Sequence, residues 1–104
     1  MTVTLITGTN SGIGLATVIR LAGAGHQVYA GVRNPDDAQK LAAIAQGDAR
    51  ISMLELDVTN ETTIVDAVAQ VLSIEGQVDV LINNAGISRG SPWENGYNEL
   101  RAVV

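Results

Sequence analysis

A glycine-rich stretch near the N-terminus has the residue types and spacing of a phosphate-binding turn. Its sequence is Thr7-Gly8-Thr9-Asn10-Ser11-Gly12-Ile13-Gly14, and it lies between the apolar run Val3–Ile6 and a helical pattern over Ile13–Ala24. Backbone N–H groups at the start of a helix lack intrahelical partners and lie at the positive end of the helix dipole, so they attract anions. The stretch therefore predicts a site for a phosphate group where the first helix begins.

Each glycine of this turn has its own predicted role. Gly8 is expected to make the tight turn, Gly12 to clear space for a pyrophosphate, and Gly14 to let the helix pack closely on the strand. No Gly-Lys-Ser/Thr follows, which excludes a Walker P-loop. The alternative is a glycine-rich connection between a strand and a helix with no ligand, because one such motif alone has limited specificity.

Composition narrows the classes of protein and partner. The chain has 104 residues, enough for one small domain or a piece of a larger one, and 46% of them are hydrophobic. A net charge of −5 argues against nucleic acid or an anionic membrane as the main partner. Cysteine is absent and His26 is the only histidine, so no disulfide and no metal site are predicted. No stretch reaches the ~18 apolar residues of a membrane span, and we expect a soluble, cytoplasmic protein.

Strand-like and helical patterns alternate along the rest of the chain. After the first helix, the sequence predicts strands over Val28–Val32, Ile51–Leu56 and Val78–Ile82. A second helix is expected to begin at the N-cap Asn34 with Pro35 in its first turn, to end at Gly47, and to bury Ala38, Leu41, Ala42 and Ala45. A third is expected to begin at Thr59-Asn60-Glu61, to end at Gly76, and to bury Ile64, Val68, Val71 and Leu72. Residues 94–104 have the pattern of the start of a fourth helix.

Repeated strand–helix units are typical of an α/β fold with a doubly wound parallel sheet. The carboxyl ends of parallel strands meet at one edge of the sheet, where such folds bind ligands. Arg33, Asp57 and Asn83–Gly86 all follow predicted strands, as the glycine-rich turn does. We therefore expect four polar segments to converge at one nucleotide site.

These motifs together resemble those of the short-chain dehydrogenase/reductase family. The family motif TGxxxGIG is matched by residues 7–14, its acidic residue after the third strand by Asp57-Val58, and its NNAG motif by Asn83-Asn84-Ala85-Gly86. The resemblance implies a single Rossmann-type domain over residues 1–104 with strand order 3-2-1-4, a nicotinamide dinucleotide cofactor and an alcohol or carbonyl substrate. Asn83 and Asn84 have a structural alternative, because side-chain amides also bond to turn backbone.

The catalytic residues of the resembled family do not match positions of this chain. They are a Tyr-x-x-x-Lys pair, an upstream serine and a helical asparagine, all expected beyond Val104, so the chain is predicted to be truncated before its catalytic half. Tyr97-Asn98-Glu99-Leu100-Arg101 imitates the spacing, but an arginine replaces the lysine. No catalytic residue is therefore assigned, and residues 1–104 alone are expected to be inactive.

Two other functions compete with the oxidoreductase. One is a non-catalytic nucleotide-binding module, and the other is a sugar-nucleotide epimerase, which the spacing of Gly12 and Gly14 disfavours. The predicted strand Val78–Ile82 would lie at a sheet edge, so we expect residues 1–104 alone to self-associate or to be poorly stable. A homo-oligomer is expected for the protein.

The end of the second strand bears on which dinucleotide is bound. An NAD site usually has an acid there for the ribose hydroxyls, whereas residues 30–33 contain no acid and end in Arg33. Arg33 and Ser11 suit the 2′-phosphate of NADP. Alternatively, Arg33 is a solvated residue leading into Asn34-Pro35, and Asp36 or Asp37 could pair with it and weaken its effect; NAD is the alternative cofactor. The residues predicted to bind the cofactor are Gly8, Asn10, Ser11, Gly12, Ile13, Gly14, Arg33, Asp57, Val58, Asn83, Asn84, Ala85 and Gly86.

Overall fold

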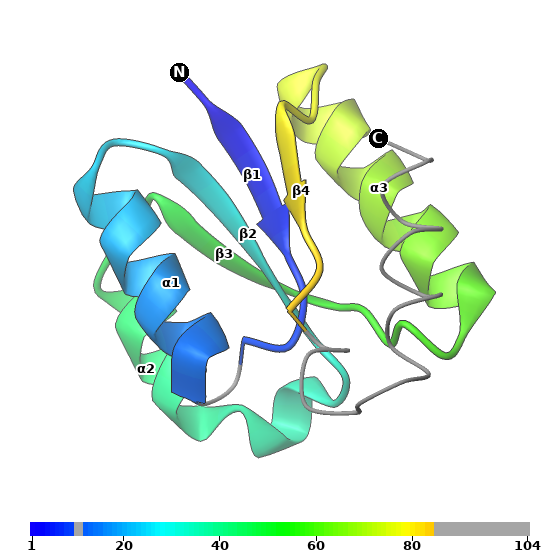
Figure 1. Ribbon diagram of the computed structural model, residues 1–104, viewed down its shortest axis with the longest axis horizontal. Coiled ribbons are helices and arrows are strands. Elements are labelled where there is room, and N and C mark those ends of the chain that lie inside the picture. The colour runs from blue at the N-terminus through cyan, green and yellow to red at the C-terminus, as the bar shows by residue number, and fades with distance from the viewer. Residues whose placement is uncertain (10–11, 85–104) are drawn as a thin grey trace.

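A four-stranded parallel sheet forms the centre of the protein in a computed structural model, which describes residues 1–9 and 12–84 (Figure 1). The strands are β1(Val3–Ile6), β2(Gln27–Val32), β3(Ile51–Glu55) and β4(Val80–Ile82). Their order across the sheet is β3-β2-β1-β4, and every neighbouring pair is parallel. The predicted Rossmann-type fold and its strand order are confirmed.

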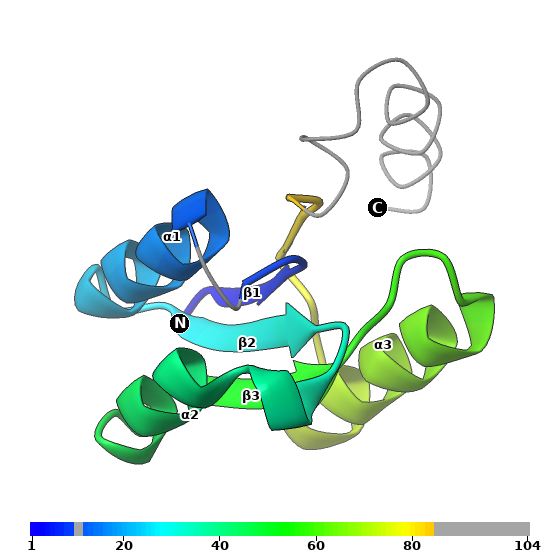
Figure 2. The same ribbon diagram turned by 90° about the horizontal axis from the view of Figure 1, so that it is seen from below.

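Helices cover both faces of this sheet. Figures 1 and 2 show α1(Gly12–Gly23) and α2(Gln39–Gln46) on one side and α3(Glu61–Glu75) on the other. Two clusters of buried residues match this arrangement. The α1/α2 cluster joins residues of those helices to the strand residues Ile6, Val28 and Val32. The α3 cluster joins Ala67 and Val71 of that helix to Val3, Leu5, Tyr29, Leu54 and Leu56. Because alternate strand residues enter opposite clusters, the strands are apolar on both faces, as buried parallel strands require.

The segment after β2 differs from the single helix that the sequence predicts. Pro35–Asp37 form a short 3-10 helix capped by Asn34, whose side-chain oxygen accepts from the N–H of Asp36 at 3.1 Å. Ala38 then leaves helical geometry, with φ −98° and ψ 55°, and α2 begins at Gln39. Ala38 is fully buried in the α1/α2 cluster, so the break places its methyl group in the core.

The ends of α3 agree with the sequence pattern, but one buried position does not. The side chain of Asn60 accepts from the N–H of Thr62, and Gly76 ends the helix in the left-handed conformation at φ 77°. Leu72 is 45% exposed, whereas Ala67 and Val71 are buried. Consecutive helix positions are rotated by about 100°, so a helix that buries Ala67 and Val71 turns Leu72 partly away from the sheet.

The fourth strand starts two residues later than predicted. The N–H of Val3 donates to the side chain of Asp79 at 2.8 Å, and the N–H of Asp79 donates to the carbonyl of Val3 at 2.9 Å. Residue-to-residue pairing of the strands then begins at Thr4 and Val80.

Some predictions fall on residues outside the described part of the chain. These are the site residues Asn10, Ser11, Ala85 and Gly86, the helix predicted over residues 94–104, and Tyr97. Within residues 1–9 and 12–84, no helix has the length and apolar character needed to cross a membrane.

Candidate cofactor site

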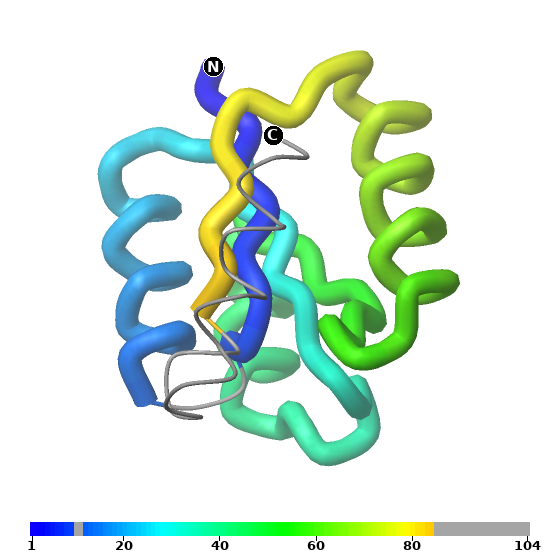
Figure 3. Tube along the Cα trace, turned by 45° about the vertical axis from the view of Figure 1, so that its right-hand side comes forward, coloured from blue at the N-terminus to red at the C-terminus, as the bar shows by residue number. Residues whose placement is uncertain are grey.

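The carboxyl ends of β1 and β4 lie beside the start of α1, as the tube in Figure 3 shows. Gly8 has φ 66° and Gly12 has φ 60°, both in the left-handed region that favours glycine. Among the described residues other than its chain neighbours, no atom lies within 4 Å of a Cβ atom placed at Gly12, so these residues leave space at the position predicted for a pyrophosphate. Ile13 is 70% exposed at the start of the helix.

Gly14 has no room for a side chain. A Cβ atom there would lie 2.0 Å from the carbonyl oxygen of Gly8 and 2.7 Å from the side-chain nitrogen of Asn84. The close packing expected at this glycine is therefore present, and it joins the helix to the segments that follow β1 and β4.

The two asparagines after β4 bond to the turn after β1. The Thr7 hydroxyl donates to the side-chain oxygen of Asn83 at 3.1 Å and accepts from the N–H of Asn84 at 3.0 Å. The Asn84 amide donates to the carbonyl of Gly8 at 3.0 Å. The structural role considered for both asparagines is thus present, while cofactor contact stays a prediction.

Thr9 joins the same turn to the end of β2. Its hydroxyl donates to the carbonyl of Gly31 at 3.0 Å, and its backbone N–H points to the same oxygen at 3.4 Å. Thr9 itself is fully buried.

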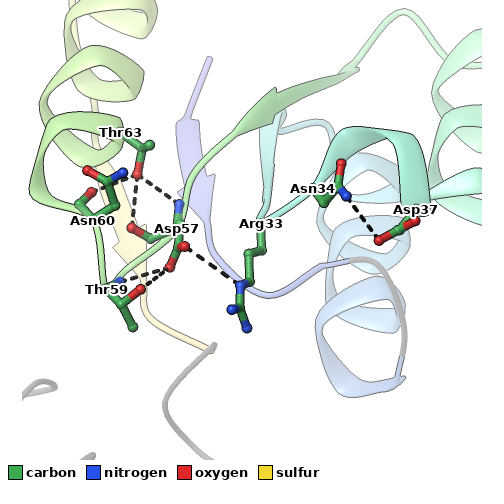
Figure 4. Close-up of polar contacts among 7 residues, drawn as sticks. All are labelled: Arg33, Asn34, Asp37, Asp57, Thr59, Asn60 and Thr63. Atoms are coloured by element: carbon green, nitrogen blue, oxygen red, sulfur yellow. Dashed lines mark hydrogen bonds and ion pairs between the residues drawn. The ribbon is translucent and has the colours of Figure 1, made fainter.

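Arg33 and Asp57 form an ion pair between the ends of β2 and β3 (Figure 4). Nε of Arg33 lies 3.6 Å from Oδ2 of Asp57, and the two side chains are 75% and 23% exposed. Because Arg33 is so exposed, water screens this pair, and its terminal nitrogens are accessible to a ligand. Asp37 instead accepts from the side-chain nitrogen of Asn34 at 3.1 Å, so the pairing of Arg33 with Asp36 or Asp37 considered from the sequence is wrong for this structure.

Asp57 is held in place by two polar residues besides Arg33, Thr59 and Thr63. The hydroxyl and N–H of Thr59 donate to Oδ1 of Asp57 at 2.7 and 2.9 Å. These two bonds are the main cause that lowers the pKa of Asp57, and the Arg33 charge adds to them. The backbone of Asp57 is fixed by the Thr63 hydroxyl, to which its N–H donates at 2.9 Å, and half-buried Val58 packs against the α3 cluster.

The polar segments predicted to converge are therefore linked in pairs. The turn after β1 bonds to Asn83 and Asn84 on one side and to Gly31 on the other, and Arg33 pairs with Asp57. Sequence reasoning gave no role to Thr7, Thr9 or Thr63 as hydrogen-bonding residues. The position of these threonines next to motif residues could have indicated such roles. Threonine is also common in strands because of its β-branched shape, so its presence alone does not indicate a hydrogen bond.

A family model described as short chain dehydrogenase matches residues 2–100. The chain belongs to the short-chain dehydrogenase family. It is 40% identical over 90 residues to a 3-ketodihydrosphingosine reductase of Bacteroides thetaiotaomicron, covering 86% of this chain and 30% of that protein. It is also 40% identical over 88 residues to a 3-oxoacyl-[acyl-carrier-protein] reductase of Thermotoga maritima, covering 84% of this chain and 36% of that protein.

Solved structures of the short-chain dehydrogenase family share the fold. An NADPH-bound carbonyl reductase from chicken fatty liver superposes with a TM-score of 0.76 at 35% identity, covering 84% of this chain and 35% of that one. The carbonyl reductase Sniffer of D. melanogaster gives a TM-score of 0.75 at 35% identity, covering 84% and 37%. The chain thus spans about a third of the length of the relatives it matches.

Proposed function

We propose that this chain is the cofactor-binding portion of an NADP-dependent oxidoreductase that acts on an alcohol or carbonyl substrate. The choice of NADP rests on the exposed side chain of Arg33 at the end of β2. Its Nε faces Asp57, and 75% of the side chain is exposed. An arginine fork suits the two or three oxygens of a 2′-phosphate. The similarity to an NADPH-bound carbonyl reductase supports the same choice.

The described residues support this proposal at two places. The space at Gly12 and the N–H groups at the start of α1 suit the pyrophosphate. Asp57 and Val58 follow β3 beside Arg33, and the family resemblance assigns the adenine contact to them. When bound, the nicotinamide supplies the hydride chemistry, and these residues supply binding and orientation.

A non-catalytic nucleotide-binding module is the second candidate, because none of residues 1–104 is assigned to proton transfer. The reductases among its relatives favour an enzyme. A Tyr-x-x-x-Lys sequence downstream of Val104 in the reading frame would decide for the enzyme.

The test is a calorimetric titration of NADP⁺ and NAD⁺ against the protein encoded by the complete reading frame. Charge-assisted hydrogen bonds contribute about 1.5–3 kcal/mol, so Arg33→Ala is expected to lose roughly ten-fold or more of NADP⁺ affinity. NAD⁺ affinity should stay nearly unchanged, since NAD⁺ lacks the 2′-phosphate. Arg33→Lys keeps the charge without the fork and should lie between wild type and Arg33→Ala.

Arg50→Ala is the matched control. Arg50 is also exposed and forms an ion pair with Asp48 at 3.0 Å. It directly precedes β3, so it lies at the amino ends of the strands, opposite the candidate site. Gly31→Asp, the other variant suggested by the sequence, is unsuitable because its Cβ would lie 2.9 Å from Cβ of Leu56 and 3.0 Å from the carbonyl oxygen of Ile6. Equal losses for both cofactors in Arg33→Ala, or tighter binding of NAD⁺ by the wild type, would refute the assignment.

A further inference from the structure

Thr9 connects the glycine-rich turn to the end of β2. It belongs to the turn that leads to the start of α1, and its hydroxyl donates to the carbonyl of Gly31, two residues before Arg33. The side chain is fully buried and directed to the backbone of β2, so it does not offer its hydroxyl to a ligand. Any effect of Thr9 on cofactor binding must therefore pass through the position of β2.

The bond replaces pairing that the sheet loses at this point. The last paired residues of β1 and β2 are Ile6 and Ala30, because β1 ends at Ile6 and Gly8 turns the chain away. The next carbonyl of β2 that faces β1 is that of Gly31, and Thr9 donates to it twice. A buried carbonyl without a donor is destabilising, so this contact fixes the end of β2 relative to the glycine turn.

Packing also confines Gly31. A Cβ atom there would lie within 3.0 Å of both Leu56 and the Ile6 carbonyl, so the backbone has no room to shift toward either of them. The bonds from Thr9 and this packing together hold the end of β2 in place.

From this geometry we propose that Thr9 is a positioning residue that sets the discrimination between NADP and NAD. By bonding to Gly31, it fixes the position of Arg33 relative to the glycine turn, and NADP would have to contact both. This inference rests on the proposed function, since it requires Arg33 to bind the 2′-phosphate. NAD lacks that group and depends less on where Arg33 lies.

The experiment is a titration of NADP⁺, NAD⁺ and 2′-AMP against Thr9→Val in the complete protein. Loss of one hydrogen bond predicts about a five-fold loss of NADP⁺ affinity, with changes below about two-fold for NAD⁺ and for 2′-AMP, which occupies only the Arg33 end. Thr9→Ser keeps the hydroxyl and should bind as wild type does, whereas Thr9→Ala should behave like Thr9→Val. In an Arg33→Ala background, Thr9→Val should cause no further loss of NADP⁺ affinity.

Thr4→Val is the matched control for the loss of a buried threonine hydroxyl. Thr4 is also fully buried on β1, and its hydroxyl contacts Nδ1 of His26 at 3.1 Å, near the opposite end of the sheet. The proposal is overturned if Thr9→Val weakens NADP⁺ and NAD⁺ equally, if Thr9→Ser fails to restore the preference, or if Thr4→Val gives the same change. If Arg33→Ala alone leaves NADP⁺ binding unchanged, the proposed function fails. If Arg33→Ala acts and Thr9→Val does not, only the role of Thr9 fails.

Discussion

Replacing Gly14 by alanine is expected to destabilise the fold more than its size suggests. The added methyl group would lie 2.0 Å from the Gly8 carbonyl oxygen and 2.8 Å from the Gly8 carbonyl carbon, which are backbone atoms. It would also lie 2.7 Å from the Asn84 side-chain nitrogen, which donates to that same carbonyl at 3.0 Å. The turn and the helix therefore have to separate.

The size of the effect follows from three contributions. Overpacking costs about 1–3 kcal/mol, and contact with backbone puts this site near 3 kcal/mol. Loss of the bond from Asn84 to Gly8 adds about 1 kcal/mol. Alanine favours a helix over glycine by about 1 kcal/mol, which offsets part of this. The net expectation is a loss of about 3 kcal/mol in the free energy of unfolding.

Gly23→Ala is the matched control within the same helix. Apart from its chain neighbours and its own helix backbone, no atom of residues 1–9 and 12–84 lies within 4 Å of a Cβ atom placed at Gly23. This variant should therefore be neutral or stabilised by up to about 1 kcal/mol. Urea unfolding followed by circular dichroism measures the free energy of unfolding of both variants. Similar stability of Gly14→Ala and Gly23→Ala would show that the contact between the turn and the helix does not constrain the fold.

Two further predictions concern the sheet. The Tyr29 hydroxyl donates to Glu75 at 2.5 Å, and burial, followed by that bond, raises the pKa of Tyr29 to about 12. The pKa of Tyr29 in the folded state lies above the ordinary 10.0, so its contribution to the free energy of unfolding should be complete below pH 10 and fall as the pH rises toward 12. Urea unfolding over this pH range measures the fall, and Tyr29→Phe should not show it. Residues 1–104 expressed alone should self-associate, because β4 lies at the edge of the described sheet and Val65 and Ile74 of α3 are 59% and 61% exposed. A monodisperse monomer in light scattering, with a sharp melting transition, would contradict this prediction.

The strands could be predicted from the sequence because its apolar runs are short, separate and bounded by glycine or polar turns. Their order across the sheet was predicted only from the resemblance to the short-chain dehydrogenase/reductase family. Prediction from the sequence failed where packing decides the outcome. The break at Ala38 depends on which methyl group enters the core, and the exposure of Leu72 depends on how α3 is rotated over the sheet. A stripe of apolar residues does not fix that rotation when alanines take part in it.

Prediction of the site had a similar limit. Glycine spacing indicated the turn, and the carboxyl ends of the strands indicated where Arg33 and Asp57 lie. The sequence could not show that Arg33 pairs with Asp57 rather than with its neighbours, because residues 33 and 57 meet only through the pairing of β2 with β3. The roles of Thr7 and Thr9 as links between segments likewise depend on tertiary contacts.

The exposure of Arg33 separates the part of the site that evolution can change from the part that it cannot. Gly14 and Gly31 are confined by backbone atoms within 3.0 Å of any added Cβ, so nearly every substitution there is removed by selection for folding. Arg33 extends into solvent with 75% of its side chain exposed, where substitutions usually change stability by less than about 0.5 kcal/mol. The proposed role of Arg33 in binding the 2′-phosphate therefore implies that a lineage can change its dinucleotide through substitutions at position 33 while its scaffold stays the same.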